Sequence, residues 1–209
     1  TTTCGLNWNK GNWILNNQEK ARIINKKLMQ LYPDAKVELR YDSPFHLLIA
    51  TILSAQCTDD RVNKVTPFLF QRFQTPEDFA EADIEEIKEI IRSTGFFNNK
   101  AKSILALSQQ LVEKHNSQVP ASMKELVALP GVARKTANVV LGEAFQIYDG
   151  VVVDTHVKRL SHRLGLSQHT NPEKIEQDLM NLLAREEWFL FSTRLMWHGR
   201  RVCKARKPD

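Results

Sequence analysis

One lysine occupies a position from which its side chain could take part in covalent chemistry. Lys135 falls in the first turn of a helix that we predict to begin directly after Pro130 and Gly131. At about 100° per residue, its side chain lies nearly opposite the apolar stripe of that helix, beside Asn138 and Gly142. The dipole of the helix disfavours a proton on an amine in this turn, and a neutral amine can attack an electrophilic carbon. Taken alone, an outward lysine is equally an ordinary solvated residue.

The turn before Lys135 has the residues that an anion-binding helix start requires. Gly131 can take backbone angles closed to other residues and has no side chain to block a close approach. We expect the amides of Gly131, Val132 and Ala133 to point outward at the helix N-terminus, where the dipole favours an anion. Such a hairpin of two helices suits a DNA phosphate and carries no base information. A plain turn between two helices is the alternative.

The charge of the chain is unevenly distributed. The 209 residues carry 29 Lys and Arg against 24 Asp and Glu, a net charge of +5. Residues 75–94 hold seven acids and two bases, whereas residues 200–207 hold five bases and no acid. We therefore expect a basic side that faces a polyanion and an acidic side that faces solvent. Random scatter with a soluble tail is the other interpretation.

Length and composition exclude several classes of protein. A chain of 209 residues can form one large domain or two small ones with a sizeable core. Its longest apolar stretch, residues 45–57, is too short to span a bilayer, and no signal-peptide pattern opens the chain. Three scattered cysteines fit a reducing compartment without a disulfide framework. We therefore set aside membrane and secreted proteins and expect a cytoplasmic one.

Helix signals recur along the whole chain, and strand alternation is almost absent. Start signals such as Ser43–Pro44 and Thr75–Pro76 precede apolar residues at helical spacing. Further caps are predicted at Asn16 with Glu19, Asp83 with Glu86, Ser122 with Glu125, Asp154, and Asn171–Pro172. About ten helices with short connections result, and the one strand-like run, residues 151–153, is expected to be a buried connector. The sequence thus predicts an all-α fold.

Several motifs together resemble one known family. The hairpin segment reads LPGVARKTANVV (residues 129–140), and VDTH follows at residues 153–156. The same family pattern includes three other segments, LSAQCTD (53–59), GFFNNKA (95–101) and MWHGRRVC (196–203). In these segments the chain is similar to the helix-hairpin-helix DNA glycosylases, and specifically to the endonuclease III group. The resemblance covers nearly all of the chain after about residue 17.

The resemblance implies two helical domains that flank a DNA-binding cleft. Residues 37–148 would form a six-helix barrel with the hairpin, and residues 1–36 with 149–209 a second domain of the iron–sulfur type. Lys135 matches the catalytic lysine of the family and Asp154 its catalytic aspartate. In that chemistry the lysine attacks the sugar C1′, the base leaves, a Schiff base forms and β-elimination breaks the strand. The aspartate deprotonates the lysine or stabilises positive charge on the sugar, a role compatible with a plain helix N-cap.

Substrate and DNA contacts are likewise implied by the resemblance. The substrate would be double-stranded DNA with oxidised pyrimidines or abasic sites, bound by a monomeric enzyme near the bacterial nucleoid. Gln56 and Phe96 match positions that fill the space left by a flipped nucleotide. Asp59 falls in the loop that shapes the base pocket, whereas His156 and His198 are expected to be structural. The remaining DNA contacts fall on Gly131, Val132, Ala133 and Arg134.

The resemblance also implies a [4Fe–4S] cluster, of which Cys203 would be the first ligand. Four thiolates hold such a cluster, and the second is expected directly after the sixth residue that follows Cys203. That sixth residue, Asp209, is the last of the chain, while Cys4 and Cys57 match no ligand position. Residues 1–209 alone therefore cannot assemble the cluster. Either the parent chain supplies three further cysteines, or this variant has lost the cluster.

Three alternatives to a lesion-specific lyase are open at this point. An adenine-mismatch glycosylase generally lacks a lysine at the position of Lys135 and carries a further recognition domain. A non-catalytic DNA-binding module would use the hairpin only to hold phosphates, which leaves the pairing of Lys135 with Asp154 unexplained. A helical protein-interaction domain would leave both the hairpin and the basic C-terminal segment unexplained.

Overall fold

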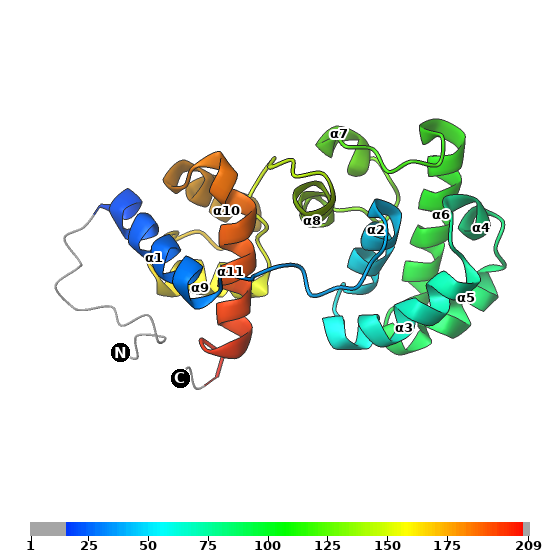
Figure 1. Ribbon diagram of the computed structural model, residues 1–209, viewed down its shortest axis with the longest axis horizontal. Helices are drawn as coiled ribbons and strands as arrows, with labels where there is room; N and C mark the ends of the chain where they lie inside the picture. The colour runs from blue at the N-terminus through cyan, green and yellow to red at the C-terminus, as the bar shows by residue number, and fades with distance from the viewer. Residues whose placement is uncertain (1–15, 207–209) are drawn as a thin grey trace. The chain divides into compact units, whose positions relative to one another are not determined.

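Helices make up all the regular structure of residues 16–206, the part of the chain that the computed structural model describes. Since no strand occurs in this part, the predicted all-α fold is confirmed for it (Figure 1). The run Val151–Val153 is a non-helical connector in which the first two valines are buried, as predicted. Among residues 16–206 no helix combines the length and the apolar character needed to cross a bilayer. Cys4 and Lys207 lie outside the described residues.

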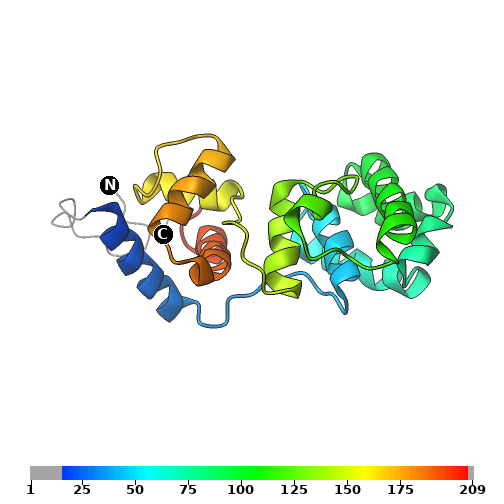
Figure 2. The same cartoon turned by 90° about the horizontal axis from the view of Figure 1, so that it is seen from above.

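The chain divides into two compact units. One unit is continuous, Glu38–Ile147, and the other combines Thr1–Val37 with Tyr148–Asp209. In Figures 1 and 2 the colours show this division, because blue and orange-to-red helices share one unit and cyan-to-green helices the other. Lys135 belongs to the continuous unit and Asp154 to the discontinuous one.

The continuous unit is built around one helix that is buried on every side. Its α-helices are α2 (Pro44–Leu53), α3 (Asp59–Arg72), α4 (Pro76–Ala80), α5 (Ile84–Ile91), α6 (Phe97–His115), α7 (Met123–Leu126) and α8 (Arg134–Ala144). Every residue of α2 after Pro44 is buried, and α2 contacts α3, α6 and α8. A helix that is apolar all round belongs in the centre of a core. A 3-10 turn, η2 (Arg92–Thr94), joins α5 to the loop before α6.

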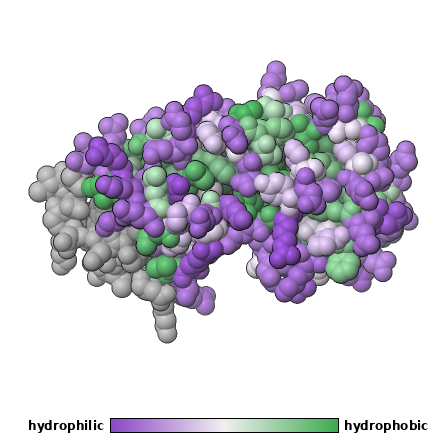
Figure 3. Space-filling view, in the orientation of Figure 1, coloured by the Kyte–Doolittle hydropathy of each residue, from purple (hydrophilic) through white to green (hydrophobic). Residues whose placement is uncertain are grey.

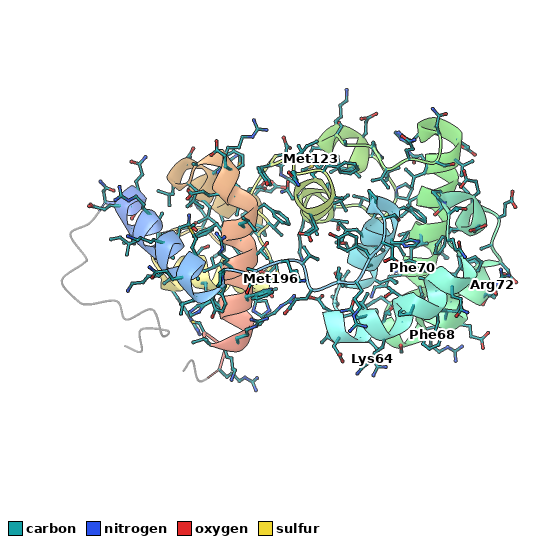
Figure 4. All side chains as sticks on the ribbon, in the orientation of Figure 1. Lys64, Phe68, Phe70, Arg72, Met123 and Met196 are labelled. Carbon is teal, nitrogen blue, oxygen red and sulfur yellow. The ribbon has the colours of Figure 1, made fainter. Side chains whose placement is uncertain are left out.

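Aromatic residues fill the part of this unit that α3 and α4 cover. Phe79 is fully buried and makes edge contacts with Phe45 at 5.5 Å between ring centroids. Phe70 stacks on His46 at 3.9 Å. Figure 4 shows Phe70 on the side of α3 that faces the unit, and Phe68 on the opposite side, where it is 68% exposed.

The discontinuous unit joins the N-terminal helix to the C-terminal third of the chain. Its helices are α1 (Asn17–Leu31), α9 (Thr155–Arg163), α10 (Pro172–Leu182), the 3-10 turn η3 (Arg185–Glu187) and α11 (Trp188–Arg201). Their buried faces form one core, which includes Ile24, Leu28, Leu160, Leu179 and Phe191. Two polar contacts reinforce it, from Tyr32 Oη to His198 Nδ1 at 3.0 Å and from Asn25 Nδ2 to Glu187 Oε1 at 2.6 Å.

Most of the predicted helix starts are present, but two caps differ from their prediction. Ser43 Oγ accepts a backbone N–H of α2 at 3.1 Å, as a Ser-Pro start predicts. Asp83 caps α5, whereas Glu86 does not reach back to it, because its carboxylate binds the guanidinium of Arg72 instead. Ser122 precedes α7 but makes no capping bond with its side chain. Both capping sequences are present, but Asp83 lacks the return bond from Glu86 and Ser122 lacks the bond from its own side chain.

The acidic segment lies on the surface, as its composition predicts. Six of the seven acids between residues 75 and 94 are exposed, and the seventh, Glu86, is half-buried against Arg72. Figure 3 shows hydrophilic residues over most of the face in view. The expectation of a solvated acidic surface is therefore confirmed for this segment.

The shared core of the discontinuous unit predicts unequal effects of two adjacent substitutions on α1. Leu28 is fully buried, so Leu28→Ala should lower the free energy of unfolding by about 2–5 kcal/mol. Met29 is 47% exposed, so Met29→Ala should change it by no more than about 0.5 kcal/mol. Urea unfolding of both variants measures the difference. Equal and small losses would show that α1 does not pack on the C-terminal helices.

Candidate active site

The hairpin before Lys135 is closed by two successive backbone hydrogen bonds. The N–H of Leu129 donates to Leu126 at 3.1 Å, and the N–H of Val132 donates to Leu129 at 3.2 Å. Leu129 and Val132 are both buried, so their side chains anchor the turn in the core of the unit. The expectation that the amide of Val132 points outward is therefore wrong, because that amide closes the turn. Gly131 and Ala133, on either side of it, are exposed.

Gly131 is required by both its backbone angle and its surroundings. Its φ of +77° lies in the left-handed region that residues with a Cβ rarely adopt. A Cβ at this position would also lie 2.6 Å from Cβ and 2.8 Å from Oγ of Ser103 on α6. The turn is thus seated directly against the side chain of Ser103 on α6, and this contact helps to fix where the following helix begins.

Helix α8 begins without a capping side chain and with two cations. Ala133 occupies the N-cap in an extended conformation, and a methyl group cannot accept a hydrogen bond. Arg134 and Lys135 follow in the first turn, where the helix dipole disfavours positive charge, and both are exposed. The helix dipole opposes this arrangement of cations, and an anion at the helix start would interact favourably with both the dipole and the cations.

Beyond its first turn, α8 is buried on more sides than its sequence predicts. Lys135 is exposed, as expected. Asn138, however, is only 4% exposed, and Gly142 is also buried. The expectation that Lys135 shares an open face with these two residues is wrong, because α8 contacts both α2 and α7. Lys135 therefore stands at the exposed end of a helix whose remainder lies in the core.

Asp154 is the N-cap of α9, as predicted. Its Oδ1 accepts the backbone N–H of His156 at 2.9 Å and that of Val157 at 2.8 Å. The side chain is half-buried at the end of the connector from Val151. Two backbone bonds and the positive end of a helix dipole hold its carboxylate in one orientation.

His156 and His198 have structural surroundings. Burial lowers the pKa of His156, an effect opposed by the carboxylate of Asp154 and reinforced by Arg159 and Arg200. A neutral ring fits this site, since Nδ1 of His156 lies 3.3 Å from the guanidinium of Arg159. His198 is 1% exposed and bonded to Tyr32. Neither histidine has the open surroundings expected of a proton donor to a substrate.

Gln56 and Phe96 share an unusual backbone conformation. Both are exposed, and both have positive φ, +53° for Gln56 and +50° for Phe96. Phe96 is 63% exposed and forms the N-cap of α6 without any capping bond from its side chain. Strained backbone of this kind is often found at functional sites.

Comparison with known proteins agrees with this geometry. The family model described as "HhH-GPD superfamily base excision DNA repair protein" matches residues 49–185. The endonuclease III of Synechocystis sp. is 56% identical over 191 residues, which cover 91% of this chain and 87% of that protein. The endonuclease III of Bacillus subtilis is 44% identical over 92% of this chain and 88% of its own length.

The chain belongs to the endonuclease III family of the HhH-GPD superfamily.

Solved members of the endonuclease III family have the same fold. A structure described as a trapped endonuclease III–DNA covalent intermediate superposes with a TM-score of 0.89 at 43% identity. The superposition covers 94% of this chain and 92% of the chain in that structure. A non-covalent endonuclease III–DNA complex gives the same TM-score and identity. The prediction of the family from the hairpin and VDTH segments is therefore confirmed.

The residues present do not fit the iron–sulfur cluster that the endonuclease III resemblance implies. Cys203 is fully buried, and its Sγ accepts a hydrogen bond from Arg163 at 3.2 Å. Cys57 belongs to the other unit, and Cys4 lies outside the described residues. Within residues 16–206 no group of three or more His, Cys, Asp or Glu is arranged to hold a metal. Three cysteines cannot supply four thiolate ligands.

One residue near the strained loops was missed from the sequence. Lys100 is only 6% exposed, and its Nζ donates to the backbone carbonyls of Leu53 and Thr94. Its position had a signal, because residues 100, 104, 107 and 111 share one face of α6 and the other three are apolar. A lysine in a buried stripe indicates a bonded amine rather than a solvated one.

The seat of the hairpin on α6 predicts different costs for two glycine substitutions. Gly131→Ala adds overpacking against Ser103 to backbone strain, so it should destabilise more than Gly165→Ala by about 1–3 kcal/mol. Gly165 has φ +66°, and an added Cβ would meet only Lys20 Nζ, at 3.4 Å, so its variant reports strain with little crowding. Denaturant unfolding of both variants measures this. In a Ser103→Gly background the difference should shrink, and an unchanged difference would contradict the contact.

Proposed function

We propose that this protein is a base-excision-repair DNA glycosylase and abasic-site lyase that acts on oxidised pyrimidines in double-stranded DNA. The observation that carries the proposal is the exposed Lys135 at the uncapped start of α8. Endonuclease III has been described in a trapped covalent intermediate with DNA, and that relative shares 43% of its sequence with this chain. A lysine amine is the group that forms a covalent Schiff base with a sugar carbon.

Lys135 acts as the nucleophile. Its neutral amine attacks C1′ of the damaged nucleotide, the glycosidic bond breaks, and the base leaves with a proton. The sugar ring opens, so that C1′ and Nζ form a protonated Schiff base. Removal of a proton from C2′ then expels the 3′ phosphate, which breaks the strand, and water releases the lysine. The anionic backbone of the bound DNA offsets the two cations in the first turn of α8.

Asp154 assists at the same carbon. Its carboxylate accepts the proton that Lys135 loses, or stabilises positive charge on the sugar as the base departs. The two backbone bonds to its Oδ1 fix the orientation that either role needs.

The hairpin and the two strained loops bind the duplex. Gly131, Ala133 and Arg134 contact a phosphate at the start of α8, which positions the DNA without reading its sequence. Gln56 and Phe96 enter the space left by the flipped nucleotide, and the exposed ring of Phe96 stacks on the unpaired base. Residues 37–148 serve as the six-helix barrel and residues 1–36 with 149–209 as the iron–sulfur type domain.

Cys203 is a ligand of a [4Fe–4S] cluster only if three more cysteines come from outside these 209 residues. In the structure Cys203 is disulfide-bonded, and its buried sulfur lies beside the guanidinium of Arg163. We place the protein in the bacterial cytoplasm, at the nucleoid, and as a monomer on DNA.

Borohydride reduction tests the proposed nucleophile. Mixed with duplex DNA that carries an abasic site or an oxidised pyrimidine, the protein should yield a covalent adduct, because borohydride reduces the Schiff base to a stable amine. Lys135→Ala should abolish the adduct, whereas Lys114→Ala, at the exposed C-terminal end of α6, should not. Intact DNA binding without an adduct from the unaltered protein would indicate a non-catalytic module.

Two substitutions of Asp154 separate its role as the N-cap of α9 from its proposed catalytic role. Asparagine caps a helix as well as aspartate, so Asp154→Asn should leave the free energy of unfolding within about 0.5 kcal/mol. It removes the charge, and strand cleavage should fall about 100-fold or more. Asp154→Ala should lose about 1 kcal/mol of stability in addition. Full activity of Asp154→Asn would make the residue a cap alone.

A further inference from the structure

Lys100 connects two loops that are distant in sequence. Its Nζ donates to the carbonyl of Leu53, the last residue of α2, at 2.8 Å and to the carbonyl of Thr94, the last residue of η2, at 2.9 Å. Both acceptors are neutral. Burial lowers the pKa of Lys100, and the nearby Cys57 acts in the opposite direction. Burial of an amine costs free energy, so its presence here indicates that the two carbonyls it bonds have to be held in place.

The two carbonyls lie a few residues before the two strained residues. Leu53 precedes Gln56 by three positions, and Thr94 precedes Phe96 by two. The carbonyl of Phe96 accepts the first backbone hydrogen bond of α6 from residue 100 at 3.1 Å, a bond that does not depend on the lysine side chain. Left-handed conformations at non-glycine residues persist only where the surroundings enforce them. The side chain of Lys100 thus bonds the backbone shortly before each of the two strained residues.

Among residues 16–206, Phe96 differs in its position from the other non-glycine residues with positive φ. Gln56 follows α2, Asn116 and Ser117 follow α6, and Gln146 follows α8, where left-handed residues commonly end helices. Phe96 stands at a helix start, where extended backbone is the rule. Its conformation therefore needs the outside support that Lys100 supplies.

We propose that Lys100 is a positioning residue that holds the Gln56 loop and the Phe96 loop in register, so that both side chains enter the duplex as one unit. The inference rests on the proposed function, in which these two residues occupy the space of the flipped nucleotide. Lys100 touches neither the reacting sugar nor Lys135 in this account. Its loss impairs extrusion of the damaged nucleotide and leaves the reaction at C1′ intact.

The test compares substrates that do and do not need extrusion. Lys100→Met keeps the aliphatic stem and removes the donors, and Lys114→Met is a matched control at the exposed end of α6. Single-turnover strand cleavage is measured on duplex DNA with an oxidised pyrimidine and on a single-stranded oligonucleotide with an abasic site. A 2-aminopurine beside the lesion reports extrusion by its fluorescence, and thermal unfolding reports the fold.

For Lys100→Met we expect a 10- to 100-fold slower reaction on the duplex, about the cost of a small misplacement of a positioning group. The 2-aminopurine signal should fall in parallel, while the single-stranded rate stays within about twofold, because no base has to be unstacked. Lys100→Arg, which keeps donors, should recover part of the duplex rate, and Lys114→Met should match the unaltered protein. Equal losses on both substrates, or none on either, would overturn the proposal.

A second measurement does not depend on how well Lys100→Met folds. If the two loops act as one unit, Gln56→Ala and Phe96→Ala should each slow the duplex reaction, and the double variant should be little slower than the worse single one. Effects that multiply would mean that the loops act independently, which contradicts the proposal. If the unaltered protein gives no borohydride adduct with either DNA, the proposed function fails and this inference fails with it.

Discussion

The contact between Gly131 and Ser103 decides where the start of α8 and Lys135 lie in the continuous unit. A hairpin that approached α6 less closely would tolerate a Cβ at residue 131, and here a Cβ would meet Ser103 at 2.6 Å. Lys100 lies one turn before Ser103 on the same helix, so the two side chains are neighbours on its surface. The first two turns of α6 therefore seat the hairpin and hold the Gln56 and Phe96 loops. A shift of this helix end would displace all of them together.

The helix starts of α8 and α9 carry opposite charges. The start of α8 places two cations where its own dipole disfavours them and omits a capping side chain. The helix dipole does not stabilise cations at this end, whereas a phosphate bound here would interact favourably with both the dipole and the cations. The start of α9 has the opposite charge, because the carboxylate of Asp154 caps the helix and accepts two of its backbone N–H groups. The start of α8 therefore lacks a capping side chain, whereas the start of α9 is capped by the carboxylate of Asp154.

The sequence predicted the parts of this site that depend on local rules. The all-α fold, the hairpin at Pro130–Gly131 and the cap at Asp154 follow from turn and capping chemistry, and the motifs around them predicted the family. The burial of Asn138 was missed, because a single helical stripe does not reveal that α8 packs against two partners. The amide of Val132 was misjudged because its bond to Leu129 depends on the turn geometry. The two bonds of Lys100 were missed because no local rule links residues 53, 94 and 100.

The most direct test of the account is to identify the residue that carries the DNA after borohydride reduction. The adduct with an abasic duplex is digested with nuclease and protease, and mass spectrometry locates the reduced sugar on a peptide. The account predicts that the mass increase falls on Lys135, in the peptide that begins after the hairpin turn. A sugar attached to another lysine would contradict the assignment of α8 as the reactive helix.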